Sequence, residues 1–485
     1  MEAKGALIAA PLLIASITAA STAAAAKAGV KPARLAAVIG SIACLVASFA
    51  VAPLVEDSPA ILSRTPALLF LDAYGALLLE KFTMAAAASL LLAMVYLDRV
   101  DDPAYYVSMV ASLLGIVGVV YSGDLLSFFA FYALMNLSSY YFMAPRPSEE
   151  VGVDTGPNDS LTLYLVSDVV SMVLVASGFL ILYTSSGATG IPEVVARAST
   201  EALWASLALV ISGFWVKLAI FPAHAWFPGI NPWAPSPSSA FMASAVRVVG
   251  FYGATRMLFT VYRPLLPALK SFMLYAALVN IAVGCLLALG QDDLKRLVTC
   301  SSVGEGGVLM MAWGVASTTA LQGVFFHVLN LVLIKCLFFS SIAYFISASD
   351  RRTVYTLRGA SRSMLLGSTG FLIASLSTCA MPPLNGFHSK FLVFLSLVES
   401  GLLWAACAFV VLDLLMLAVL MKAVHAMYDR YAGEGLKVRE PGLGLKLLIA
   451  VLIASCLLVG LAPSMFMEGA YKAALACLNE AWMKG

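Results

Sequence analysis

Charged side chains are scarce in this 485-residue sequence. Asp, Glu, Lys and Arg together make up 12% of it, against about a quarter in a typical soluble protein. Apolar residues make up 61%, which is more than a single water-soluble core could bury. The net charge of +2 provides no basic surface of the kind that binds nucleic acid. The composition therefore predicts a protein that lies mostly within a lipid bilayer.

Sequence motifs for cofactors and nucleotides are also missing. The eight cysteines are scattered, and no Cys-x-x-Cys or Cys/His cluster occurs, which disfavours an iron–sulfur or zinc site. The sequence contains no Walker motif and no GxGxxG-plus-acid pattern, which disfavours ATP-driven transport and nucleotide-dependent redox chemistry. We therefore expect no cofactor, no metal and no catalytic redox site within this chain.

Long apolar runs dominate what is present, and runs of about 20 residues predict membrane-spanning helices. The fold class we predict is an all-α polytopic membrane protein, with residues 1–485 forming a single membrane domain. The loops are too short to hold a soluble domain. The fourteen predicted spans are 5–26, 35–55, 73–97, 104–122, 124–143, 160–184, 201–230, 236–262, 268–290, 295–317, 319–347, 363–397, 402–428 and 445–464.

The distribution of basic residues predicts the orientation. Lys27, Lys31 and Arg34 follow the first span, and alternating loops place most other basic loop residues on that same side. The positive-inside rule then places both termini outside the cell membrane. We interpret the first span as a retained helix because its apolar run is longer than that of a signal peptide. Residues 467–485 are expected to form a surface helix on the outer face.

A set of charged residues falls inside the predicted spans, where a charge near the bilayer centre costs about 3 kcal/mol on insertion scales. Structural explanations suit some of them. Lys81 and Arg256 lie near span ends and fit snorkelling to the interface, while Glu80 and Lys81 point apart on a helix. Glu305 is expected on a glycine-rich turn in a packing or hinge role, and Asp413 fits either a helix–helix hydrogen bond or a transport role. The set is Glu80, Lys81, Asp168, Lys217, Arg247, Arg256, Glu305, His327, Lys335, Lys390 and Asp413.

Two of these lysines lie beside predicted helix breaks. Proline interrupts a helix in its interior, and the interruption frees backbone carbonyls and admits water locally. A pair of interrupted spans points to a transporter's ion site and to an internal inverted repeat. The two clusters are Lys217 with Pro222, and Lys390 with Pro382, Pro383 and Gly386.

Lysine chemistry suits proton transfer at such a place. Burial favours the neutral amine and a nearby carboxylate favours the ammonium, so a lysine held between them exchanges a proton when a neighbouring charge moves. Arginine stays protonated and acts as a fixed positive charge. The expected proton-transfer residues are Lys217, Lys335, Lys390 and His327, and the expected fixed or modulating charges are Arg247, Asp168, Glu305 and Asp413.

Five sequence blocks follow one another between about residues 70 and 430. They are 124–126 with 134–135 and 139–140; 217–226 with 234–237 and 239–240; 291–296 with 301–303; Asn330 and Lys335 with 337–339; and 382–387 with 389–390. In these blocks the chain resembles the antiporter-like membrane subunits of respiratory complex I (NADH-quinone oxidoreductase). That family includes Mrp-type sodium/proton antiporter subunits and membrane subunits of energy-converting hydrogenases.

The resemblance implies a particular fold. It implies two inverted five-helix repeats, helices 4–8 at about 104–262 and helices 9–13 at about 268–428, with helices 7 and 12 broken. It also implies a hydrated line of charges along the bilayer mid-plane. The positions on that line are Lys217, Arg247, Lys335 and Lys390.

The chain departs from the family pattern at several positions. Ala133 stands where the family carries the helix-five glutamate that partners the seventh-helix lysine, and Arg247 replaces the helix-eight lysine. Leu331 and Gly229 replace a histidine and an aspartate. Asp168 in the sixth predicted span is the candidate substitute acid.

Three functions remain open on the sequence. The first is a proton-translocating subunit of a complex-I-like or hydrogenase-type redox complex, coupled to electron transfer in partner subunits. The second is an Mrp-type cation/proton antiporter subunit, in which sodium would need an oxygen-rich site. The third is a degenerate, non-conducting subunit that seals and scaffolds a complex. The expected partners are other membrane and redox subunits, the lipid bilayer, and protons or sodium, with no nucleic acid.

Overall fold

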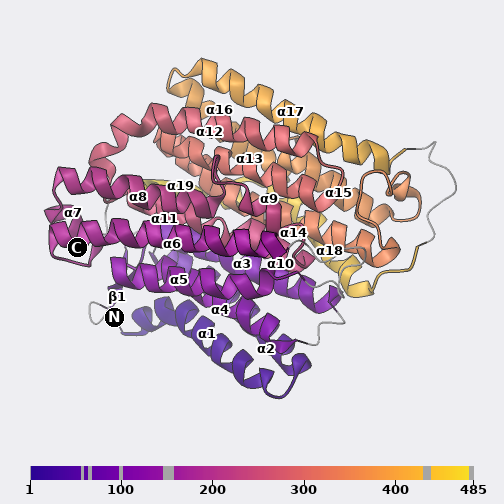
Figure 1. The fold of residues 1–485 in the computed structure, drawn as a ribbon, viewed down its shortest axis with the longest axis horizontal. Helices are drawn as coiled ribbons and strands as arrows, with labels where there is room; N and C mark the ends of the chain where they lie inside the picture. Colours follow the sequence, from indigo (N-terminus) through magenta and orange to yellow (C-terminus); the bar gives the residue numbers. More distant parts are fainter. Residues whose placement is uncertain are drawn as a thin grey trace.

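The computed structural model describes residues 2–55, 59–63, 68–97, 102–145, 158–429 and 438–479, and these residues are almost entirely helical. The long helices lie side by side along the longest axis of the molecule (Figure 1). Eleven of the described helices are long and apolar enough to cross a membrane. The chain is therefore a multi-pass, predominantly helical membrane protein, which agrees with the predicted fold class.

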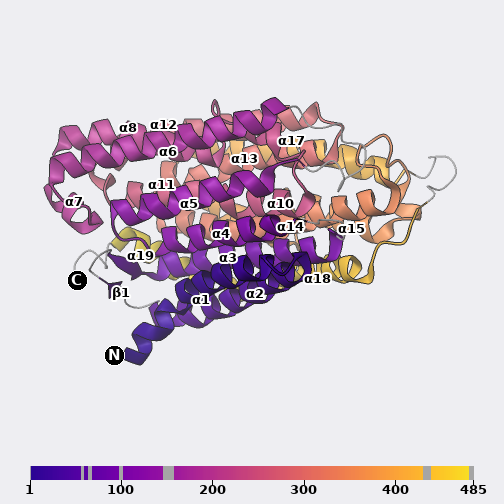
Figure 2. The same ribbon diagram turned by 60° about the horizontal axis from the view of Figure 1, so that its bottom comes forward.

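The first helices form one side of the molecule. The turned view shows α1 and α2 together in front of the remaining helices (Figure 2), and α2 packs against α3. The carboxylates of Asp72, Asp102 and Asp124 accept backbone N–H bonds at the starts of α3, α4 and α5, which fixes where these helices begin. The elements are α1 (Glu2–Ala26), α2 (Val30–Val55), the antiparallel strands β1 (Ala60–Ser63) and β2 (Leu69–Leu71), α3 (Ala73–Tyr96), α4 (Pro103–Tyr121), α5 (Leu125–Met143) and α6 (Asn158–Ser186).

The seventh and eighth predicted spans are interrupted helices. The seventh stops after Leu218 and resumes at Trp226, so the interruption surrounds Pro222 as predicted. The eighth contains a π-helical turn between two α-helical pieces. The elements are α7 (Ile191–Arg197), α8 (Thr200–Leu218), α9 (Trp226–Ile230), α10 (Ser236–Phe241), the π-helix η1 (Met242–Val246), α11 (Val249–Phe259) and the 3-10 turn η2 (Arg263–Leu265).

A second interruption lies in the last part of the chain. The twelfth predicted span stops after Thr378 and resumes at Asn385, on either side of Pro382 and Pro383. The elements are α12 (Leu266–Leu289), α13 (Leu294–Val315), α14 (Thr318–Ser349), the 3-10 turn η3 (Ala360–Arg362), α15 (Leu365–Thr378), α16 (Asn385–Glu399), α17 (Leu403–Met427), α18 (Leu443–Leu461) and α19 (Ser464–Asn479).

The core of the molecule is α14, the longest of the described helices. It packs against α3, α10, α13, α15, α16, α18 and α19, and nearly all of its residues are buried. Its apolar residues contact these neighbours around the whole circumference, as expected of a helix that is hydrophobic on every face. It carries His327, Asn330 and Lys335 into the centre of the bundle.

Some predictions about organisation stay predictions. The spans predicted at 236–262, 295–317 and 363–397 are helical, but they are interrupted or more polar than the eleven apolar helices. The total of fourteen spans and the inverted repeats are therefore untested. The predicted surface helix at 467–485 corresponds in part to α19, which packs against α14 and α3 through small residues such as Ala473. Residues 480–485 lie outside the described part of the chain.

Candidate functional site

Lys217 lies at the end of α8, beside the first helix break. Ala219 follows in the left-handed conformation, with φ at 58°, and the chain then passes through a cis Phe221–Pro222 bond to α9. Asn280 of α12 accepts the backbone N–H of Phe221 at 2.8 Å. A side chain from a neighbouring helix therefore satisfies backbone that the break exposes.

Asp168 of α6 reaches the buried end of Lys217. The Lys217 Nζ lies 2.9 Å from Asp168 Oδ1, and both side chains are buried. The rings of Tyr164 and Trp226 flank the same ammonium, with centroids 5.5 and 5.8 Å from Nζ. The structure thus brings the candidate substitute acid into contact with the seventh-span lysine, whereas Ala133 offers no carboxylate.

Further polar side chains surround this ion pair, and sequence reasoning missed them. The hydroxyls of Tyr132 and Ser171 lie 2.6 Å apart, and those of Ser139 and Tyr164 are also hydrogen-bonded. The sequence does contain a pattern that could have identified these side chains. Polar residues recur at helical spacing along two apolar spans, which indicates one polar face on each helix. The two stripes are Tyr132, Asn136 and Ser139 on α5, and Tyr164, Asp168 and Ser171 on α6.

Arg247 caps the first broken helix. It follows the π-helical turn, is fully buried, and donates from Nη1 to the carbonyl of Leu218, the last residue of α8, at 2.8 Å. Its guanidinium also lies 5.0 Å from the ring centroid of Phe227. Gly306 of α13 makes this approach possible, because a Cβ there would lie 3.3 Å from Arg247 Nη1 and 2.9 Å from Ile220 Cδ1. A permanent cation therefore satisfies a carbonyl that the break leaves unbonded.

Glu305 and Lys335 form an ion pair between α13 and α14. The Lys335 Nζ lies 3.5 Å from Glu305 Oε2, and both side chains are buried. Glu305 also interacts electrostatically with His327, Lys390 and Arg247. The prediction that Glu305 sits on a glycine-rich turn is wrong, because α13 is helical throughout this stretch. The glycines beside it instead allow α13 to pack closely on α12.

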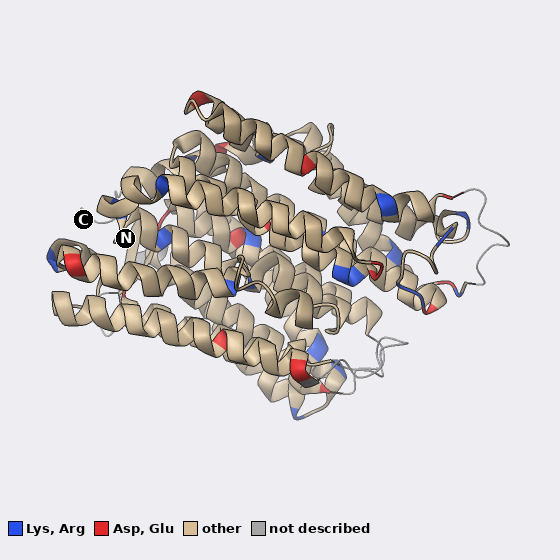
Figure 3. Cartoon of the chain, turned by 45° about the horizontal axis from the view of Figure 1, so that its top comes forward, with Lys and Arg blue, Asp and Glu red and all other residues tan. Residues whose placement is uncertain are grey.

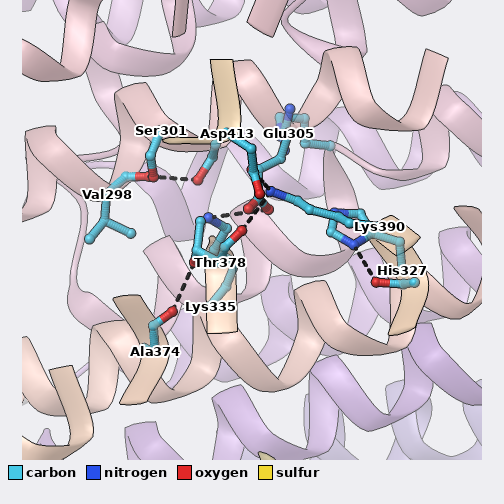
Figure 4. Close-up of polar contacts among 12 residues, drawn as sticks. Val298, Ser301, Glu305, His327, Lys335, Ala374, Thr378, Lys390 and Asp413 are labelled. Carbon is cyan, nitrogen blue, oxygen red and sulfur yellow. Dashed lines mark hydrogen bonds and ion pairs between the residues drawn. The ribbon is translucent and has the colours of Figure 1, made fainter. Parts of the chain in front are cut away.

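His327 and Asn330 connect α14 to the second half of the broken twelfth span. The His327 Nδ1 lies 3.0 Å from the hydroxyl of Ser389, and the Asn330 amide donates to the same oxygen at 2.9 Å. Asn330 also donates to the backbone carbonyl of Asn385 at 2.9 Å. These contacts hold the start of α16 against α14, and Figure 4 shows His327 beside Lys390.

Lys390 makes two polar contacts across the second break. Its Nζ donates to the carbonyl of Thr378, the last residue of α15, at 2.6 Å, and it forms an ion pair with Asp413 of α17 (Figure 4). A cavity of about 300 Å³, lined mainly by apolar side chains such as Phe391 and Phe409, adjoins the pair. Asp413 thus contributes more than a helix–helix hydrogen bond, since it carries the charge opposite Lys390.

The backbone of the second break resembles that of the first. Ala380 has a φ of 54°, and a cis Pro382–Pro383 bond follows. Gly386 lies in the first turn of α16, where a Cβ would collide with the carbonyl of Ser377. Glycine at this position therefore lets the two half-helices approach each other closely.

Several buried polar atoms near these ion pairs find no hydrogen-bond partner among the described residues. Buried polar groups are ordinarily hydrogen-bonded, and water serves where the protein supplies no partner. The atoms are Asp168 Oδ2, both amide atoms of Asn136, Arg247 Nε and Nη2, both carboxylate oxygens of Glu305, His327 Nε2, Lys335 Nζ, Asn330 Oδ1 and both amide atoms of Asn385.

Two charged pairs near helix ends differ from their predicted arrangement. Lys81 Nζ lies 2.6 Å from Glu80 Oε2, because the two long side chains bend toward each other although their Cβ atoms diverge. Arg256 does not snorkel. It is buried and donates to both oxygens of Asp72, at 2.6 and 2.8 Å, since the start of α3 presents that carboxylate inside the protein.

Metal ligands do not cluster within the described ranges. No group of three or more His, Cys, Asp or Glu side chains there could hold a metal ion. The acids of the site pair with lysines and arginines instead.

The sequence and the fold of this chain are both similar to those of known proteins. Residues 122–416 match the family described as NADH:quinone oxidoreductase/Mrp antiporter, TM. NADH-quinone oxidoreductase subunit N of Moorella thermoacetica is 24% identical over 408 residues, which cover 81% of this chain and 83% of the relative. A chain of the Mrp complex from Dietzia sp. has a TM-score of 0.88 at 19% identity, covering 100% of this chain and 99% of that one. A chain of the membrane-bound sulfane sulfur reductase, an archaeal respiratory membrane complex, has a TM-score of 0.86 at 20% identity, covering 99% and 98%.

Proposed function

Because this chain belongs to the NADH:quinone oxidoreductase/Mrp antiporter family, we propose that it is a proton-translocating subunit of a membrane redox complex related to complex I. In this proposal, electron transfer takes place in partner subunits and is coupled to proton movement in this chain. One observation carries the proposal. Buried ion pairs succeed one another through the bundle, from Asp168–Lys217 past Arg247 and Glu305–Lys335 to Lys390–Asp413.

The second half of this series supplies the proton-transfer groups. Glu305 interacts electrostatically with Lys335, His327 and Lys390. A change of charge at one of these groups therefore changes how favourable a charge is on each of the others. Such interactions are strong because the groups are buried and poorly screened. When Lys390 gives up its proton, Asp413 loses its counter-ion, and the positive charge on Lys335 becomes more favourable. The unpartnered polar atoms around these groups support a hydrated route between them.

In the first half, Asp168 takes the role of the absent helix-five carboxylate. It stabilises the ammonium of Lys217, and the hydroxyls of Tyr164 and Ser139 lie close to the same acid. Arg247 keeps its proton and therefore passes no proton between the halves. It transmits charge changes electrostatically instead, since it interacts with Glu305.

The proposed orientation places both termini outside the cell membrane. Basic residues gather at one end of the bundle (Figure 3), where the α14–α15 connection meets the α12–α13 turn. Arg352 is bonded to Asp293 at 2.6 Å there, and Lys422 to Asp292 at 3.0 Å. The positive-inside rule makes this end cytoplasmic. The two similarly built breaks support the proposal that helices at 104–262 and 268–428 form inverted repeats.

The test replaces Lys390 by arginine in the assembled complex. Lys390→Arg keeps the cation and its bond to the Thr378 carbonyl, but an arginine does not release its proton. We expect redox-driven acidification to fall about tenfold or more, in line with loss of an acid–base group. Assembly and electron transfer to an artificial acceptor should be retained.

The matched control is Lys422→Arg, which makes the same exchange at an exposed ion pair nine positions along α17 from Asp413. It should leave acidification unchanged. Wild-type proton stoichiometry in Lys390→Arg would show that the second half does not conduct protons, and the sealing, non-conducting role would then be favoured.

A second candidate, cation/proton exchange, is favoured by the oxygen-rich surroundings of Asp168. Asp168 Oδ2 and Asn136 Oδ1 are both unpartnered, and hydroxyls of Ser139 and Tyr164 lie nearby. Oxygen ligands of this kind suit a hard cation that would displace the Lys217 ammonium. Transport that depends on sodium, and loses that dependence in Asp168→Asn, would support exchange over proton pumping alone.

A further inference from the structure

A pocket of mixed charge lies outside the line of ion pairs, between α2, α3 and α19. Its volume is about 460 Å³. Glu80 and Lys81 of α3 lie deep in it, with side chains 9% and 8% exposed, and their ion pair is 2.6 Å long. Glu468 and Lys472 of α19 lie toward the rim, and their ion pair is 3.2 Å long. Two acids and two lysines from different helices thus face one small volume.

The walls of the pocket and its depth distinguish it from the central site. Glu80 lies seven residues into α3 and Lys472 seven residues before the end of α19, so each is about 10 Å from that end of its helix. On α3 this position lies toward the end where the helix begins, because that end is about 10 Å away and the other end, at Tyr96, is about 24 Å away. The remaining lining is mostly apolar, and its larger members are Phe49, Pro53, Leu77, Met465 and Phe466.

An apolar stripe continues from the pocket along α3. Met84, Ala88 and Leu91 recur at helical spacing from Lys81 and are partly buried, whereas most of α3 is fully buried. Exposed apolar side chains of α2 and of α18, such as Val46 and Leu458, occur on the helices that pack against α3. A polar pocket toward one end of α3 therefore adjoins an apolar strip that continues along the same helix.

We propose that this pocket binds the headgroup of a zwitterionic phospholipid that carries a phosphate and a primary ammonium. The ammonium groups of Lys81 and Lys472 donate to the phosphate, and the carboxylates of Glu80 and Glu468 accept from the lipid ammonium. One acyl chain lies along the stripe on α3. Each charge of the pocket then keeps a partner of opposite sign, and the apolar walls exclude water from these contacts.

Charge balance favours this ligand over its alternatives. The four side chains sum to zero, so a purely anionic headgroup would lie against two carboxylates. An apolar helix of a partner protein would remove water from the two ion pairs and add no polar contact to them, which is costly. A headgroup with both signs of charge satisfies all four groups at once.

The experiment measures lipid retention by the purified full-length chain in detergent. The chain is reconstituted with dioleoylphosphatidylethanolamine or dioleoylphosphatidylglycerol, washed, and analysed by native mass spectrometry and by thermal unfolding. We expect phosphatidylethanolamine to be retained and to raise the unfolding temperature, and phosphatidylglycerol to do neither. The rim variants Lys472→Ala and Glu468→Ala should each weaken retention about tenfold, the loss expected for one charge-assisted hydrogen bond.

The matched control is Lys422→Ala, because Lys422 forms an ion pair of 3.0 Å and is 38% exposed, against 3.2 Å and 33% for Lys472. It should retain phosphatidylethanolamine like the wild type. The proposal is overturned if both lipids are retained equally, or if the rim variants retain as much as the control. It is also overturned if the assembled complex carries no retained lipid while the isolated chain does, since a partner subunit would then occupy the pocket.

Discussion

The two helix breaks differ in the cation that satisfies the exposed helix end. At the first break, the final carbonyl of α8, from Leu218, accepts from Arg247, which comes from a different helix. At the second, the final carbonyl of α15, from Thr378, accepts from Lys390, which belongs to the second piece of the same broken span. One break is capped by a charge that never leaves, and the other by a group that can lose its proton.

The pairing of the acids follows the same division. Lys217 pairs with Asp168 and leaves the helix end to Arg247, so charge pairing and capping are carried out by separate cations in the first half. Lys390 pairs with Asp413 and also caps, so both functions rest on one amine in the second half. Loss of a proton from Lys217 would therefore leave the cap from Arg247 in place, whereas loss of a proton from Lys390 would also weaken its bond to the Thr378 carbonyl, because a neutral amine is a weaker donor than an ammonium.

The largest expected difference between the halves concerns stability. Lys217→Ala and Lys390→Ala each strand one member of a buried ion pair, which costs about 3–5 kcal/mol. Lys390→Ala also strands the Thr378 carbonyl, adding about 1 kcal/mol or more. Denaturant unfolding of both variants in detergent measures this difference. A less stable Lys217→Ala would mean that the second break does not depend on its lysine for capping.

The next effect tests how tightly each break is packed. Gly386→Ala forces a Cβ against the Ser377 carbonyl and should cost about 1–3 kcal/mol. Gly229→Ala in α9 is the matched control, because its nearest contact would be Leu163 Cδ2 at an ordinary 3.7 Å. Thermal unfolding of the two variants should show a clear loss for the first and almost none for the second. Equal losses would remove the packing difference between the breaks.

A transport measurement tests whether the relocated acid makes the first half active. Asp168→Asn leaves Lys217 without a carboxylate, and we expect redox-driven proton transport to fall about tenfold. Adding Ala133→Glu to this variant should restore transport, since it returns the acid to the position that the family uses. Vesicle acidification checks both variants. An unimpaired Asp168→Asn, or a failed rescue, would leave Asp168 as a packing residue.

The smallest expected effect concerns Arg247→Lys. Lysine keeps a positive charge within reach of the Leu218 carbonyl but loses the stacking on Phe227. Transport should change less than about threefold, because the fixed charge acts electrostatically and relays no proton. A large gain in transport, measured by the same acidification assay, would show that arginine blocks a proton route between the halves.

Local features of this protein could be predicted from the sequence. Apolar runs gave the helices, and Pro222, Pro382 and Pro383 gave the positions of both breaks, because a proline acts on its own helix. Lys217 and Lys390 could be chosen for the same reason, since each is close in sequence to a break. Nothing beyond the neighbouring residues is needed for these inferences.

Pairings between helices could not be predicted in the same way. Asp168 and Lys217 are 49 residues apart, and their contact depends on how α6 and α8 are rotated against each other. The partnership of Glu305 with Lys335 went unrecognised because the glycines around Glu305 suggested a turn, whereas they serve close packing on α12. Lys81 and Glu80 were expected to point apart because they are adjacent on a helix. Their side chains are long and flexible enough to form an ion pair all the same.

The helix α14 is uninterrupted, so the charged groups that it carries keep a fixed spacing. His327 and Lys335 are eight positions apart on it, so their backbone positions stay about 12 Å apart along the helix axis. Lys390 on α16 belongs instead to a half-helix, which is attached to α14 through Asn385 and Ser389 and to the end of α15 through its own ammonium. In the proposed mechanism, a change of charge at Lys390 therefore acts on a half-helix, whereas the charged groups of α14 keep their spacing.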